Sequence, residues 1–241
     1  MLIISLVWLQ VTSALTGGWE TVERVSVPWV EGVGSYELSI EQHVGSPDHR
    51  ADSARVRIRV PGRPDFVFVN DTNPYPFRAL DELTVLNKEV LRFPYRLRSR
   101  YAILTNALLG KRRPPVLLLV GDGGEDPDPL IIIALDKTGY PVTIFYAELA
   151  VTELRDLDGD GLPELVGNAT YAEGLGKCTA SYDPYSVFKI VRTATPRVSY
   201  DIALSKSYNE AHYVWAGPHF DPKWKVDHCT HGKYRLRPMN R

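Results

Sequence analysis

Alternating apolar and polar positions mark the first third of the chain. Residues 37–41 and 55–60 each alternate with a period of two, which is the pattern of half-buried β-strands. The Pro-Gly-Arg-Pro sequence at 61–64 predicts a turn, and the apolar residues 66–69 then predict a returning strand. This region is therefore expected to form strands joined by short turns.

The middle of the chain has longer apolar runs. Continuous apolar residues predict buried strands over 116–120 and 130–135. An Asp-Lys-Thr-Gly turn at 136–139 leads into a returning strand over 142–146. Three further strand-like segments follow, at 151–154, 165–166 and 185–191. Successive hairpins of this kind favour antiparallel sheets.

The period changes after Pro196. Apolar residues then recur at helical spacing, at Leu204, Tyr208, Ala211 and Trp215. With Ser199 as N-cap and Gly217-Pro218 as a stop, they predict an amphipathic helix over about 199–215, followed by an irregular tail over 216–241. The expected fold class is mainly β, with antiparallel sheets built from hairpins, propeller-like or sandwich, and one C-terminal amphipathic helix.

Composition narrows the class of protein without identifying it. The 241 residues are 44% hydrophobic and 24% charged, with a formal net charge of -1 at pH 7. These values are typical of a globular protein with a sizeable core, and they give no argument for bulk attraction to nucleic acid. The sequence contains no nucleophile elbow, phosphate loop, dinucleotide fingerprint or zinc-protease motif, which lowers the expectation of an enzyme.

The first residues indicate export. An apolar run at 1–9, followed by Val-Thr-Ser-Ala at 11–14, is interpreted as a signal peptide, with a buried N-terminal strand as the alternative. The run is too short for a transmembrane anchor. We therefore expect a secreted or periplasmic protein whose residues 15–241 form a single β-rich domain. In that setting Cys178 and Cys229 predict one disulfide, worth ~3–4 kcal/mol in the chain-entropy model.

An acidic loop carries the clearest chemistry. Asp156, Asp158 and Asp160 alternate, Gly161 permits a sharp turn, and Glu164 follows at the ninth position. Carboxylates at this spacing repel one another unless a cation neutralises them, and Ca²⁺ takes several oxygen ligands from such a loop. The loop is therefore a candidate calcium site, with a solvated acidic turn that binds no metal as the alternative.

The residues after the loop differ from those of an EF-hand. The twelfth position, where an EF-hand has its closing Glu, is Gly167, and the apolar pair Leu165-Val166 indicates a strand where an EF-hand has a helix. Residues 156–166 instead resemble the aspartate-rich loop of FG-GAP/VCBS-type repeats, the calcium-bearing blades of integrin-like β-propellers, as a local match around 151–167. The resemblance implies a Ca²⁺ ion held by the side chains of Asp156, Asp158, Asp160 and Glu164 and by the Leu162 carbonyl. The strand pattern places this loop in a core of about 114–192.

Three other groups of residues each have two interpretations. A second acidic segment could hold a cation or be a polar turn, with Asp122, Glu125, Asp126 and Asp128. A C-terminal group could ligate Zn²⁺ but lacks the usual spacing, with His212, His219, His228, Cys229 and His231. A basic belt could meet an anionic polysaccharide or protect a sheet edge, with Arg92, Arg96, Arg98, Arg100, Lys111, Arg112 and Arg113.

These observations favour an exported, calcium-binding, β-rich protein without catalytic activity, in which the metal is structural. One alternative is a secreted hydrolase that acts on polysaccharide, because paired carboxylates for glycoside chemistry need no local signature. The other is an adhesion or carbohydrate-binding module that uses the aromatic and basic C-terminal tail. The expected partners are a cell-surface polysaccharide or protein, with no nucleic acid and no transmembrane segment.

Overall fold

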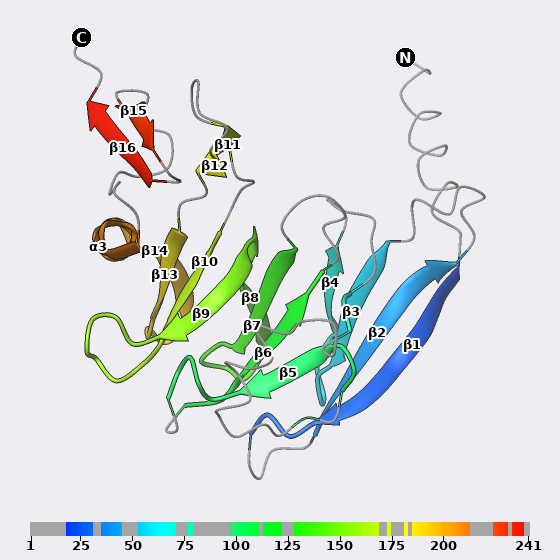
Figure 1. Ribbon diagram of the computed structural model, residues 1–241. Helices are drawn as coiled ribbons and strands as arrows, with labels where there is room; N and C mark the ends of the chain where they lie inside the picture. Colours follow the sequence, from blue (N-terminus) through cyan, green and yellow to red (C-terminus); the bar gives the residue numbers. More distant parts are fainter. Residues whose placement is uncertain are drawn as a thin grey trace, which may run out of the picture.

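The computed structural model describes residues 18–30, 35–44, 53–70, 77–79, 97, 99–110, 113–121, 128–168, 173–174, 181–182, 185–212, 224–230 and 233–238. These residues form three four-stranded antiparallel sheets, two short two-stranded sheets and one helix (Figure 1). The expected fold class, mainly β with hairpin-built sheets and a C-terminal helix, is confirmed. The signal peptide predicted at 1–14 and Cys178 lie outside the described residues, so export and the disulfide stay predictions.

The first sheet is a meander at the N-terminal end of the described chain. It pairs β1 (Gly18–Val27), β2 (Tyr36–Val44), β3 (Ala54–Arg59) and β4 (Phe66–Asn70) in that order. Leu38 pairs with Ile58 on the buried face, whereas the neighbouring pair of Glu37 and Arg59 lies on the opposite face. The strands predicted at 37–41, 55–60 and 66–69 are confirmed as β2, β3 and β4, and burial alternates residue by residue along β3. Strand β1 had not been predicted.

The second sheet contains the most apolar strands. It pairs β5 (Ala102–Thr105), β6 (Val116–Val120), β7 (Pro129–Leu135) and β8 (Pro141–Glu148), also in chain order. Every residue of β6 and β7 is buried, as continuous apolar runs predict. The hairpin between β7 and β8 turns at Asp136, whose Oδ1 accepts hydrogen bonds from the N–H groups of Thr138 at 2.8 Å and Tyr140 at 2.9 Å.

The third sheet contains the acidic loop. Its order is β14-β13-β10-β9, formed by β9 (Ala150–Arg155), β10 (Glu164–Asn168), β13 (Tyr185–Val191) and β14 (Arg197–Tyr200). A two-stranded sheet of β11 (Glu173–Gly174) and β12 (Ser181–Tyr182) lies between β10 and β13 in the sequence. The strands predicted on both sides of the acidic loop, and the one at 185–191, are confirmed.

The three sheets stack because the middle one is apolar on both faces. Alternate residues of β6 and β7, such as Leu117 and Ile131, join a core with the first sheet. The intervening residues, such as Leu118 and Ile132, join a second core that includes Leu165 of the third sheet. Figure 1 shows the three sheets following one another in chain order, and the two shared cores pack each sheet against the next.

The helix covers the free face of the third sheet. Helix α3 (Ile202–His212) packs Tyr208 against Val166 and Val187. It also satisfies the backbone of β13, since the N–H of Val187 donates to Ser205 Oγ at 2.9 Å. Among the described residues no helix is long and apolar enough to cross a membrane.

Two predictions about the C-terminal region are wrong in detail. The helix does not begin at Ser199, because β14 extends to Tyr200; Asp201 is the cap, accepting a hydrogen bond from the Leu204 N–H at 2.9 Å. The tail at 216–241 is not irregular throughout, because β15 (Trp224–Thr230) and β16 (Lys233–Pro238) form an antiparallel hairpin.

Candidate metal centre

The acidic loop joins β9 to β10 at one end of the third sheet. Its backbone shape depends on its aspartates and glycines: Gly159 and Gly161 have φ of 77° and 84°, in the left-handed region that suits glycine. The two carboxylate oxygens of Asp156 accept hydrogen bonds from these two glycine N–H groups, at 2.7 and 2.9 Å. The side chain of Asp156 therefore sits inside the loop and closes the turn.

The other two aspartates cap the turns that follow. Asp158 Oδ1 accepts a hydrogen bond from the Asp160 N–H at 3.0 Å, and Asp160 Oδ1 accepts one from the Leu162 N–H at 2.9 Å. Each aspartate therefore uses at least one oxygen to order the backbone. The alternating pattern builds the loop itself as well as its negative charge.

Glu164 closes the loop at the first residue of β10. Its side chain is buried, and its Oε2 accepts a hydrogen bond from the N–H of Leu157 at 2.8 Å. Burial raises the pKa of this carboxyl, the Leu157 hydrogen bond lowers it, and the charge of nearby Asp158 raises it again. Among the described residues, no Lys or Arg nitrogen lies within 4.0 Å of the Glu164 carboxylate.

Three of the four predicted carboxylates come together. One oxygen each from Asp156, Asp158 and Glu164 lie within 4.8 Å of one another. Asp160 does not belong to this group, since its second oxygen turns to Arg192. The resulting cluster combines two exposed carboxylates with one buried carboxylate, and all of its donors are the hard oxygen atoms that Ca²⁺ prefers.

Two cationic side chains from outside the loop neutralise part of its charge. Lys189 donates to Asp158 Oδ2 and lies 3.8 Å from Asp160 Oδ2, while Arg192 Nη2 lies 3.0 Å from the same Asp160 oxygen. The hydrogen bond between Lys189 and Asp158 lowers the pKa of the carboxyl and raises that of the ammonium. Sequence reasoning had assigned no role to Lys189 or Arg192. The signal for Lys189 was a lone cation within the apolar strand 185–191.

Leu162 anchors the loop to the second sheet. Its Cδ2 lies beside Gly110 in the connection between β5 and β6, where a Cβ on that glycine would approach to 3.3 Å. The φ of Gly110 is 81°, so glycine suits this position sterically and conformationally. The Leu162 carbonyl, which the resemblance implies as a metal ligand, stays a prediction.

Among the described residues, no other candidate ligand joins this cluster. In the second acidic segment Asp122, Glu125 and Asp126 lie outside the described residues, whereas Asp128 pairs with Arg78 at 2.8 Å. Of the C-terminal group, His219 and His231 also lie outside the described residues, and the backbone of Cys229 is paired with that of Tyr234 in the β15–β16 hairpin.

The basic belt is described only in part. Five of its members lie outside the described residues: Arg92, Arg96, Arg98, Lys111 and Arg112. Arg100 lies over the Tyr101 ring, and Arg113 donates to the Thr193 carbonyl at 3.0 Å, which connects the second sheet to the third. This contact gives Arg113 a structural role next to the acidic loop.

Comparison with known proteins adds no identity. No family model, curated protein or solved structure matches the chain.

Proposed function

We propose that the β9–β10 loop binds Ca²⁺ as a structural ion in an exported, non-catalytic β protein. The observation that carries the proposal is the convergence of Asp156, Asp158 and Glu164 within 4.8 Å, with Glu164 buried. A buried carboxylate next to two others is costly unless a positive charge lies close to it. A divalent cation among these oxygens supplies that charge.

The charge balance of the loop supports a dication. Four carboxylates of the loop face only two cationic side chains among the described residues, Lys189 and Arg192. These two serve Asp158 and Asp160, leaving the Asp156 and Glu164 side of the loop in excess negative charge. One Ca²⁺ ion matches that excess.

The residues that would hold the ion are those that already order the loop. Asp156, Asp158 and Glu164 are its side-chain ligands, and the resemblance adds Asp160 and the Leu162 carbonyl. The bound ion supplies electrostatic cross-linking between the loop and the start of β10. Binding to the folded state alone stabilises it by about 2.7 kcal/mol at a hundredfold excess of Ca²⁺ over Kd. An exported location supports this role, because extracellular calcium fills even weak sites.

Calorimetry and thermal unfolding test the proposal with a matched pair of variants. Asp156 and Asp136 both accept backbone N–H groups at the turn of a hairpin, but only Asp156 belongs to the acidic cluster. For the wild type we expect a binding heat and a rise in Tm of about 5–10 °C in calcium relative to chelator. Asp156→Asn abolishes that rise, and Asp136→Asn keeps it. Identical melting curves for the wild type in calcium and in chelator would refute the proposal.

A further inference from the structure

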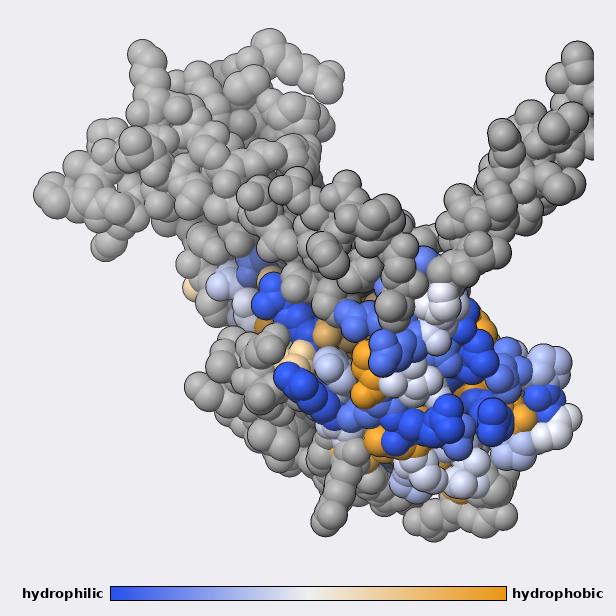
Figure 2. Space-filling view, turned by 90° about the vertical axis from the view of Figure 1, so that its right-hand side faces the viewer, coloured by the Kyte–Doolittle hydropathy of each residue, from blue (hydrophilic) through white to orange (hydrophobic). Residues whose placement is uncertain are grey.

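The outer face of the first sheet carries a second charge cluster, of opposite sign. Alternation points the apolar residues of β2 and β3 into the core and their charged residues outward. Two groups result, each with one glutamate between two arginines: Arg24, Glu37 and Arg59 in one, and Arg55, Glu41 and Arg57 in the other. Figure 2 views this side of the molecule, and hydrophilic side chains gather there in a broad band.

Arg55 is held more tightly than the two arginines beside Glu37. Arg55 donates to the buried Glu41 at 2.5 Å and lies over the Trp19 ring at 4.0 Å. Arg24 and Arg59 instead lie 3.6 Å from Glu37, beyond the usual length of a hydrogen bond, and their side chains are 58% and 64% exposed. Among the described residues no carbonyl or hydroxyl accepts a hydrogen bond from either guanidinium.

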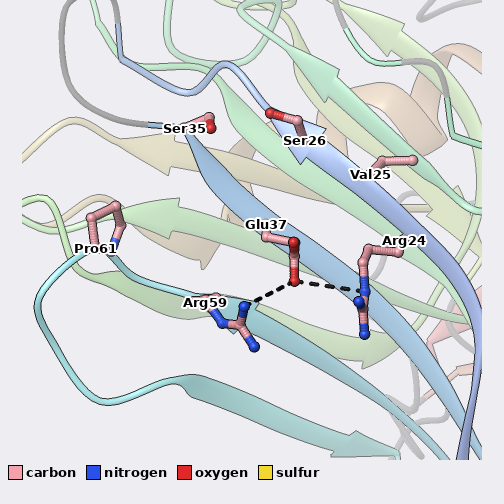
Figure 3. A pocket seen from close by; sticks show the side chains of 7 residues that line it. All are labelled: Arg24, Val25, Ser26, Ser35, Glu37, Arg59 and Pro61. Atoms are coloured by element: carbon pink, nitrogen blue, oxygen red, sulfur yellow. Dashed lines mark ion pairs between the residues drawn. The ribbon is translucent and has the colours of Figure 1, made fainter.

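A pocket opens beside this looser group. Its volume is about 380 Å³, within the range of small-ligand sites. In Figure 3 Glu37 points between Arg24 and Arg59. Ser26 and Ser35 also line the pocket and supply hydroxyl groups. Pro61 contributes apolar surface at the rim of the pocket. The residues come from three parts of the chain: β1, the start of β2, and the end of β3 with its turn.

We propose that this pocket binds an acidic sugar through its carboxylate. Two guanidiniums and one glutamate leave one positive charge, which a single carboxylate neutralises and a phosphate dianion exceeds. The serine hydroxyls suit the hydroxyls of a pyranose, and Pro61 suits its C–H surface. The site lies on a different sheet from the acidic loop and does not depend on calcium.

The neighbouring arginine indicates a chain of such sugars. Arg57 lies two residues before Arg59 on β3, a step of ~6.5–7 Å along the strand, and its side chain is 37% exposed. A second carboxylate on the same ligand can therefore meet a second cation. An oligomer of uronic acids is expected to bind more tightly than the monomer, because its second contact forms within the same complex.

Titration with galacturonate and with oligogalacturonate of defined length tests the proposal. It is run in chelator, because uronates themselves bind calcium. We expect the Arg24→Ala, Arg59→Ala double variant to bind oligogalacturonate at least tenfold more weakly, and Arg155→Ala on β9, which removes an equally exposed arginine, to bind as the wild type does. Glu37→Gln removes the carboxylate of the protein that competes with the ligand for Arg24 and Arg59, and it should tighten binding of oligogalacturonate about tenfold.

The controls separate charge, chemistry and folding. The Arg24→Lys, Arg59→Lys variant keeps the charge and should keep part of the affinity, and melting curves show whether each variant folds. Unchanged affinity in the double alanine variant, or weaker binding in Glu37→Gln, would overturn the proposal. So would equal affinity for a neutral oligogalactose. Binding of polyglutamate as tightly as oligogalacturonate would also overturn it, by assigning the pocket to acidic peptides.

Discussion

The β9–β10 loop and the outer face of the first sheet have opposite charge imbalances. In the loop, four carboxylates meet two cations, Lys189 and Arg192. On the sheet, two glutamates meet four arginines. In each region the less numerous charged groups hold the more numerous ones close together. The loop keeps an excess of negative charge and the sheet an excess of positive charge, and each excess can attract an ion of opposite sign.

The two regions differ in what their majority charges do for the fold. Each loop aspartate accepts a backbone N–H, and the buried Glu164 holds Leu157. Arg24 and Arg59 make no comparable bond with the described residues and are largely exposed. A change in the loop should therefore alter folding and binding together, whereas a change at these arginines should alter binding alone.

The largest effect is expected for Glu164→Ala. This change removes the buried hydrogen bond to Leu157, which costs about 1–3 kcal/mol of the free energy of unfolding, and it also removes the calcium-dependent stabilisation. Urea unfolding in calcium and in chelator measures both parts. Glu148→Ala, at the exposed end of β8, is the control and should change stability by less than about 0.5 kcal/mol. A Glu164→Ala protein that still gained stability from calcium would contradict the assigned role of Glu164.

Lys189→Met should separate binding from stability in the loop. The Lys189 ammonium donates a hydrogen bond to Asp158 Oδ2, so calcium must share this oxygen with the ammonium or displace the ammonium. Removal of the ammonium should therefore tighten calcium binding about tenfold. The same change should lower stability in chelator, because the carboxylates then repel one another. Calorimetric titration gives the affinity, with Lys137→Met at the β7–β8 turn as the control. Weaker calcium binding in Lys189→Met would show that the ammonium supports the site.

A smaller effect is expected from a pair of glycines. Gly161 in the loop and Gly62 in the turn after β3 both have positive φ, and a Cβ would meet open space at either. Alanine should therefore cost about 1 kcal/mol of unfolding free energy at both, through backbone conformation alone. Only Gly161→Ala should also weaken calcium binding. An equal loss of calcium affinity in Gly62→Ala would indicate a global effect.

Local patterns predicted the parts of the fold that depend on neighbouring residues. The apolar runs of β6 and β7 and the Asp136 turn were found because each carries its own signal. Strand β1 was missed because a bulge between Thr21 and Glu23 interrupts its alternation and leaves Val22 exposed. The helix start was misplaced because β14 takes up Ser199 before the cap at Asp201.

The candidate metal site likewise contains residues that the sequence predicted and residues that it did not. Asp156, Asp158 and Glu164 were found because they lie within nine residues and share one turn. The cations Lys189 and Arg192 could not be assigned from spacing, since they reach the loop only because β13 pairs with β10 across the β11–β12 insertion. Clustered carboxylates need a nearby positive charge, and either a metal ion or the protein's own lysine and arginine can supply it.

The smallest expected effect is the pH dependence of the loop, where two carboxyls move in opposite directions. The pKa of Glu164 is raised above 4.5, chiefly by burial, so the folded state holds its proton longer and stability in chelator falls as pH rises above that value. The pKa of Asp158 is lowered below 3.8 by Lys189, so its contribution to stability is complete above pH 3.8 and is lost at lower pH.

Urea unfolding from pH 3 to 8 should show the fall in stability above pH 4.5 in the wild type and its absence in Glu164→Gln. Calcium should also remove the fall, because a cation beside the ionised carboxylate stabilises the charged form. If the fall persists in saturating calcium, Glu164 does not contact the ion.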